Sequence, residues 1–148
     1  MIRHTQLEPR FVKTIPRDLE PAVLYVSMEY GTAVHSCCCG CGNEVVTPLT
    51  PTDWTLTFDG EAVSLWPSIG NWNLPCKSHY VIKRSRVIEA GPWSRDRVEA
   101  AQKREKVEKA IFYGRHFDAR QEANSAGLST PPNKASEGFW VRLRRWLS

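Results

Sequence analysis

The sequence lacks any long hydrophobic run. No apolar stretch approaches the roughly 20 residues that a membrane-spanning helix requires. The first residues, MIRHTQLEPRFVK, lack the apolar centre of a secretory signal. Internal repeats and glycine-rich phosphate-binding loops are also missing. We therefore expect a cytoplasmic protein with no membrane span.

The sequence also has only a small excess of positive over negative charge. The net charge of +4 arises from 20 lysine and arginine residues against 16 aspartate and glutamate residues. Because the two signs are mixed along the chain, the composition indicates no uniform cationic face. We therefore expect no nucleic-acid partner.

Cysteine is rare outside one short stretch. Four of the five cysteines lie in HSCCCGCG, at residues 35–42, and the fifth is Cys76. Cytoplasmic proteins rarely keep structural disulfides, and adjacent cysteines have poor geometry for pairing with each other. Thiolates are good ligands for zinc, and Gly40 and Gly42 allow the chain to fold tightly around an ion. The stretch therefore predicts a metal site.

Two registers of this stretch fit a metal ion. Cys37, Cys39 and Cys41 point to the same side of an extended chain, because they are two residues apart. Cys38 and Cys41 instead form the C-x-x-C-G knuckle of many zinc sites. Either register needs a further ligand from elsewhere in the chain.

The segment LPCKSHY supplies the remaining ligand. Its Cys76 and His79 have the C-x-x-H spacing that zinc uses. An all-thiolate site would be closed to water and structural, and it would leave His79 free for another role. We favour one structural zinc ion with this closed set, which consists of Cys37, Cys39, Cys41 and Cys76.

The first 93 residues predict one β-rich domain. The segments AVLYVSMEY, TAVHSCC, NEVVTPL, TLTFDGEAVSL and SHYVIKRSRVI are short and rich in β-branched or alternating apolar residues. An Asp-Gly pair at residues 59–60 is typical of a hairpin turn. We expect an α+β fold, in which residues 1–93 form a small, mainly antiparallel β domain clipped by zinc.

The composition changes after this domain. Pro92 and Ser94 are helix-start signals and Gly114 is a stop signal, so we expect a solvated helix over residues 94–114. The polar residues 115–137 predict a flexible linker. Residues 138–148 carry tryptophans, leucines and arginines in an amphipathic, basic pattern. The segment 139–147 docks on a partner or packs on the domain itself, and weak membrane-surface binding is a third alternative.

The segment SLWPSIGNWNLPCKSHY is too irregular for a strand and too apolar for an ordinary surface loop. A tight turn would expose the hydroxyl of Ser68, and His79 can accept the proton of that hydroxyl, as a nucleophile and its base require. Asp59 or Glu61 from the neighbouring hairpin can orient the imidazole. The alternative is structural, with Ser68 capping a turn, His79 bound to zinc and Asp59 serving only the turn.

Three stretches together resemble a known family. They are AVLYVSMEYGTAVHSCCCGCGNEVVTPL, DWTLTFDGEAVSLWPSIGNW and PCKSHYVI, within residues 11–93. The family comprises small bacterial proteins long catalogued as a domain of unknown function and encoded beside ubiquitin-like proteins with their activating and conjugating enzymes. The resemblance implies these proteins as partners and a peptidase role with a serine-based site. It does not cover residues 94–148.

Three functions remain open from the sequence. The first is a hydrolase that cleaves after the C-terminal tail of a ubiquitin-like protein, with Ser68 as nucleophile, His79 as base and Asp59 as orienting acid. The second is a zinc-stabilised binding module that presents SLWPSIGNW to a ubiquitin-like protein or its enzymes. The third is a zinc hydrolase with an open metal position, or a nucleic-acid binder that uses the basic ending.

Overall fold

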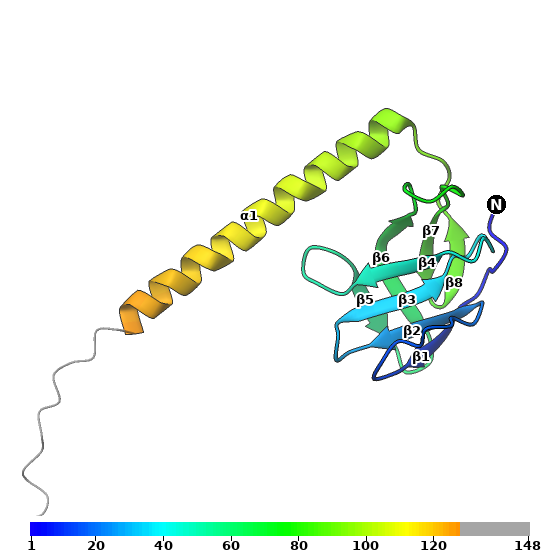
Figure 1. The fold of residues 1–148 in the computed structure, drawn as a ribbon, viewed down its shortest axis with the longest axis horizontal. Helices are drawn as coiled ribbons and strands as arrows, with labels where there is room; N and C mark the ends of the chain where they lie inside the picture. Colours follow the sequence, from blue (N-terminus) through cyan, green and yellow to red (C-terminus); the bar gives the residue numbers. More distant parts are fainter. Residues whose placement is uncertain (128–148) are drawn as a thin grey trace, which may run out of the picture. The chain divides into compact units, whose positions relative to one another are not determined.

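The protein folds into two four-stranded β-sheets followed by one helix (Figure 1). The computed structural model describes residues 1–127. The first sheet contains β1 (Glu8–Phe11), β2 (Val23–Ser27), β3 (Thr32–Ser36) and β4 (Glu44–Pro48). The second sheet contains β5 (Thr55–Phe58), β6 (Val63–Gly70), β7 (His79–Lys83) and β8 (Arg86–Glu89). The helix is α1 (Arg95–Gly127).

The strands of each sheet lie in the order in which they occur in the chain. All neighbouring strands pair antiparallel except β1 and β2, which are parallel. Such meanders need only short connections, and the Asp59–Gly60 turn joins β5 to β6, with Gly60 at a φ of 96° that favours glycine. The predicted α+β class with a mainly antiparallel β domain is confirmed.

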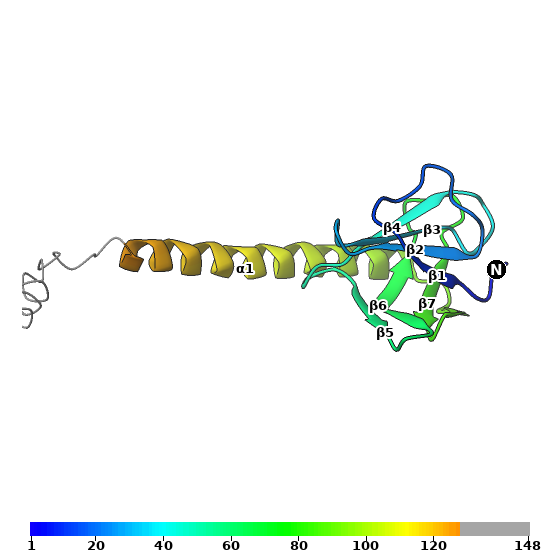
Figure 2. The same cartoon turned by 90° about the horizontal axis from the view of Figure 1, so that it is seen from below.

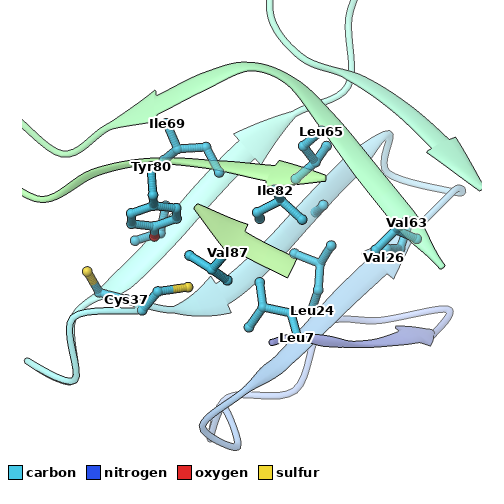
Figure 3. Close-up of a cluster of buried hydrophobic side chains, with 13 residues drawn as sticks. Leu7, Leu24, Val26, Cys37, Val63, Leu65, Ile69, Tyr80, Ile82 and Val87 are labelled. Carbon is cyan, nitrogen blue, oxygen red and sulfur yellow. The ribbon is translucent and has the colours of Figure 1, made fainter. Parts of the chain in front are cut away.

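The hydrophobic core lies between the two sheets, which face each other (Figure 2). Leu24 and Val26 of β2 and Leu65 and Ile82 of the second sheet are almost completely buried in it, as Figure 3 shows. Because side chains alternate between the faces of a strand, the residues between core positions point away from the core. The outward face of the second sheet is where the candidate site lies.

Strand β6 differs from the expectation that its second half is too irregular for a strand. It runs from Val63 to Gly70, but its register with β7 shifts between Leu65 and Ile69, and the peptide bond between Trp66 and Pro67 is cis. Proline has no N–H for the ladder, so a strand that contains it pairs irregularly at that point. The shift places Ile69 in the core and Ser68 on the opposite face.

Helix α1 begins near the expected residue but ends later. The Ser94 hydroxyl accepts a hydrogen bond from the Arg97 N–H, as an N-cap residue does. The helix passes through Gly114 and continues to Gly127, so the expected linker is helical over residues 115–127. A single glycine costs a helix only about 1 kcal/mol, and the arginines, alanines, glutamine and glutamate that follow are good helix formers.

The chain divides into two units, of which the first is Met1–Lys109 and the second begins at Ala110. Both sheets and the first part of α1 belong to the first unit. Within it, Lys109 forms ion pairs with Asp53 and Glu105. The rest of the expected linker and the basic segment 138–148 lie outside the described residues. No helix in the described part of the chain has the length and apolar character needed to cross a membrane.

Candidate active site and metal site

Ser68 and His79 lie side by side on two neighbouring strands. Gly70 of β6 pairs with His79 of β7, so Ser68 lies two residues from the position opposite His79. Ile69 and Tyr80 point into the core (Figure 3), and their neighbours Ser68 and His79 therefore share the outward face. The Ser68 Oγ is 2.9 Å from the His79 Nε2, which is hydrogen-bonding distance.

The other ring nitrogen of His79 fixes the tautomer of the ring. Its Nδ1 is 2.9 Å from the carbonyl oxygen of Gly91. A carbonyl oxygen only accepts hydrogen bonds, so the neutral ring carries its proton on Nδ1 and its lone pair on Nε2. The lone pair faces the Ser68 hydroxyl, which donates to it. This arrangement is the one that a general base needs for a serine nucleophile.

The Gly91 carbonyl is held in place by its neighbours. The Ala90 N–H donates to the carbonyl of His79 at 2.8 Å, which continues the β7–β8 ladder beyond β8. Gly91 then adopts a φ of 77°, a backbone conformation that glycine takes without strain. This turn brings its carbonyl oxygen to the imidazole. A main-chain group thus occupies the position that a carboxylate holds in a Ser-His-Asp triad.

Two tryptophans enclose the imidazole. The ring centroids of Trp72 and Trp93 are 4.9 and 5.0 Å from that of His79, and the two indoles stack at 5.6 Å. The guanidinium of Arg97 lies over the Trp93 ring at 4.2 Å, which ties the start of α1 to this cluster. The result is a nearly buried histidine whose Nε2 faces Ser68.

A cleft of about 560 Å³ opens beside the pair. Ser68, Gly70 and His79 form one wall, and Asp53 and Trp54 form part of another. The cleft is large enough to admit a short peptide segment, and its walls combine aromatic rings with charged groups from the first part of α1.

Asp59 does not reach His79. Its carboxylate accepts hydrogen bonds from the N–H groups of Glu61 and Ala62 and forms an ion pair with Arg84. The expectation that Asp59 orients the imidazole is therefore corrected. A short side chain that caps its own turn is committed to local N–H groups, and the Gly91 carbonyl takes the Nδ1 position instead.

Four cysteines gather near the start of β7. Their sulfur atoms all lie within 4.8 Å of one another, and none forms a disulfide. They are Cys37, Cys39, Cys41 and Cys76. The cluster joins the turn after β3 to the loop before β7, and it could hold a metal ion.

The donor set fits a tetrahedral ion with soft ligands. Zn–S bonds of about 2.3 Å in a tetrahedron place the sulfur atoms about 3.8 Å apart. The Cys37 Sγ is 3.5 Å from that of Cys39 and 3.9 Å from that of Cys76. Asn43 donates to the Cys41 Sγ at 3.1 Å, and its main-chain hydrogen bond is the largest cause that lowers the pKa of Cys41 to about 6. Burial instead raises the pKa of Cys37 and that of Cys39, so the fit to a metal ion depends on the sulfur geometry.

Cys38 and His79 are outside the cluster. Cys38 is fully buried in the core, and burial raises its pKa to about 12. The C-x-x-C register that uses Cys38 is therefore not the one that the structure brings together. His79 directs its two ring nitrogens to Ser68 and Gly91.

Ser78 connects the cluster to the serine–histidine pair. Its hydroxyl lies 3.2 Å from the Cys37 Sγ and 3.5 Å from the Cys76 Sγ, and Asn71 donates to it at 2.9 Å. The next residue is His79. The loop from Cys76 to His79 thus links the position of the sulfur cluster to that of the imidazole.

Sequence reasoning missed three groups of the site. The Gly91 carbonyl is a main-chain atom that no side-chain pattern reveals. Trp72 and Trp93 stand out only as rare large residues, and no spacing predicts that they enclose a histidine. Asn73 and Glu105 also line the cleft, and only the tertiary fold brings them there.

Comparison with protein families finds a match over most of the β domain. A family model described as bacterial ubiquitination-like system serine protease (BubE) matches residues 11–90, which is more than half of the 148 residues. No curated protein and no solved structure matches the chain. The matched range contains both Ser68 and His79 and all four clustered cysteines. The chain therefore belongs to the BubE family of serine proteases of bacterial ubiquitination-like systems.

Proposed function

We propose that the protein is a serine peptidase that cleaves a ubiquitin-like protein from its precursor or from its conjugates. Ser68 is the nucleophile and His79 is the general base. The observation that carries the proposal is the 2.9 Å contact between the Ser68 Oγ and the His79 Nε2, with Nδ1 held by the Gly91 carbonyl. The family's description supports the reaction class and the ubiquitin-like pathway.

The first half of the reaction forms an acyl-enzyme. The Ser68 Oγ attacks the scissile carbonyl carbon while His79 Nε2 takes the hydroxyl proton. The tetrahedral intermediate collapses when His79 gives this proton to the leaving amine, which departs. In the second half, water attacks the ester carbonyl, His79 takes a proton from the water, and Ser68 leaves with that proton restored.

The imidazolium formed in each half-reaction keeps its hydrogen bond to Gly91. A carbonyl dipole stabilises a positive ring less than a carboxylate does, because it carries only a partial charge. Trp72 and Trp93 pack against the imidazole with ring centroids 4.9 and 5.0 Å away, and this packing restricts its orientation. These groups orient the ring, and the Gly91 carbonyl accepts the Nδ1 hydrogen bond in place of an acidic residue.

The cysteine cluster has a structural role in this proposal. The four thiolates hold one zinc ion in a closed tetrahedral site, so no coordination position is left for a water nucleophile. The ion ties the turn after β3 to the loop that precedes His79. Peptide hydrolysis is then a reaction of Ser68 and His79 alone.

The test uses the ubiquitin-like protein of the same bacterial system, both as a precursor and joined to a target lysine. Wild-type protein should cleave it at one site, identified by mass spectrometry of both products. Ser68→Ala should lower the cleavage rate by about 10³-fold or more while the melting temperature and zinc content stay unchanged. Cleavage by Ser68→Ala at the wild-type rate would refute the proposal.

A second measurement does not depend on the substrate. A fluorophosphonate probe reacts with an activated serine, and it should modify wild type at Ser68 and leave His79→Ala unmodified. Absence of both cleavage and labelling, together with binding of the ubiquitin-like protein by wild type and Ser68→Ala alike, would instead support a non-catalytic binding module.

A further inference from the structure

The second half of β6 has one covered edge and one open edge. On one side it pairs with β7, through Ile69 with Tyr80 and Gly70 with His79. On the other side β5 begins at Thr55, which pairs with Trp66. In the described part of the chain, no strand pairs with residues 67–70 on that second side.

The chain before β5 turns away from this edge. The Trp54 N–H donates to the carbonyl of Pro48 at the end of β4, and the Asp53 N–H donates to Thr50. These residues therefore do not extend the β5–β6 ladder. The space that separates them from Ser68 and Gly70 is part of the cleft of about 560 Å³.

The main-chain groups of Gly70 point to the open edge. The Asn71 N–H donates to the Ser78 carbonyl at 2.9 Å, so residues 71 and 78 form a hydrogen-bonded pair. In an antiparallel ladder such pairs alternate with pairs whose groups face outward, and Gly70 with His79 is the next pair. The Ala90 N–H donates to the His79 carbonyl, which agrees with a His79 main chain that faces β8.

Regular pairing with β7 covers Ile69 and Gly70, and the register shift lies before Ile69, so the alternation fixes the main-chain orientation at Gly70. The open edge thus offers the N–H and C=O groups of Gly70, two residues from Ser68. Unpaired groups of this kind are a template for a further strand. They lie on the strand that carries the nucleophile and in the wall of the cleft.

We propose that the substrate segment with the scissile bond binds as an added strand on this open edge of β6, paired with the main chain of Gly70 and passing beside Ser68. The inference rests on the proposed peptidase function and specifies how the site recognises its substrate. The occupant is an extended peptide segment of the ubiquitin-like protein. A folded loop or a helix does not fit, because neither presents a row of main-chain groups to a strand edge.

An added strand turns the N–H of every second residue toward β6 and the others away. We therefore predict an alternating response to N-methylation of the substrate. The probe is a synthetic peptide with the C-terminal sequence of the ubiquitin-like protein, extended across the cleavage site and N-methylated at one residue at a time. Methylation of the N–H groups that face β6 should lower kcat/KM by about tenfold or more each.

The intervening positions are the matched controls. Methylation there adds the same methyl group but removes no hydrogen bond to β6, and it should change kcat/KM less than about twofold. An unmethylated peptide sets the reference rate. Equal effects at successive positions, or no effect at any position, would overturn the added-strand proposal and leave the peptidase function intact.

Binding to Ser68→Ala separates this proposal from the proposed chemistry. The same peptide series is titrated into Ser68→Ala, and fluorescence anisotropy gives each Kd. An alternating pattern of Kd supports the added strand even if wild type cleaves nothing, in which case only the peptidase proposal fails. A pattern without alternation, or no binding of the unmethylated peptide, contradicts the added strand.

Discussion

Ser68 and His79 are eleven residues apart in the chain, yet the Ser68 Oγ and the His79 Nε2 lie 2.9 Å apart. The pairing of β6 with β7 brings them together, and the Gly91 carbonyl orients the imidazole from its other side.

Replacement of His79 by alanine should lower kcat for cleavage by about 10³-fold, because general-base catalysis contributes roughly 10² to 10⁴ in rate. The exposed His116 on α1 provides the matched control, and His116→Ala should cleave at the wild-type rate. The measurement is single-turnover cleavage of the ubiquitin-like precursor. An unchanged rate for His79→Ala would show that the Ser68 contact is only structural.

The metal content of His79→Ala should equal that of wild type, one zinc ion per chain, because the sulfur cluster includes no histidine. Cys76→Ala should lose the ion, since a tetrahedral site with three thiolates binds zinc less tightly. Mass spectrometry of the native protein and inductively coupled plasma analysis measure both. Loss of zinc from His79→Ala would make this residue a ligand and remove the base from the mechanism.

Loss of the metal should also lower stability and activity in Cys76→Ala. Metal binding contributes directly to folding, and a loss of about 3 kcal/mol lowers the melting temperature of a domain of this size by roughly 10 °C. The cleavage rate should fall as well, because the short loop that contains Cys76 leads directly into β7 at His79. Activity that survives full removal of zinc at unchanged Tm would contradict this coupling.

Asp59→Asn should leave the cleavage rate unchanged, since the carboxylate bonds to the Ala62 and Glu61 N–H groups and not to His79. Its effect should be on stability. The hydrogen bonds from the Ala62 and Glu61 N–H groups lower the pKa of Asp59 below its usual value, and the bond from Ala62 has the larger effect. A rate that falls by about 10²-fold or more in this variant would restore Asp59 as a catalytic partner.

The stability effect of Asp59→Asn should depend on pH. A carboxyl group with a lowered pKa stabilises the fold above the pKa of the unfolded chain, and the stabilisation disappears as the pH falls through the folded pKa. The difference in free energy of unfolding between wild type and Asp59→Asn should therefore be largest at neutral pH and vanish in acid. Urea unfolding at several pH values measures it, and a difference independent of pH would contradict the assignment.

Trp93→Ala should lower kcat by about tenfold, because the indole packs 5.0 Å from His79 and stacks on Trp72. Trp93→Phe keeps an aromatic ring in this position and should retain most of the activity. Comparison of kcat and KM for both variants distinguishes loss of imidazole positioning, which lowers kcat, from loss of a substrate contact, which raises KM. Equal effects of the two substitutions would contradict a packing role.

The sequence predicted much of the fold from local patterns. The alternation in TLTFDGEAVSL and its Asp-Gly turn gave the β5–β6 hairpin, because side-chain period and turn chemistry are local properties. The predicted end of the helix at residue 114 was wrong, because one glycine does not outweigh the helix-forming residues that follow it. The strand nature of residues 66–70 was also missed, because a register shift next to a proline leaves no regular alternation.

By itself, the sequence determined the chemical inventory of this protein: thiols at the spacing of a metal site, a serine in an irregular apolar segment, and a histidine with two possible roles. Only the tertiary structure decided between those roles. The β6–β7 pairing sets the distance from Ser68 to His79, and the main chain at Gly91 takes the place of an acid. Spacing along a chain cannot encode these contacts, because they depend on strand register and on main-chain atoms that every residue possesses.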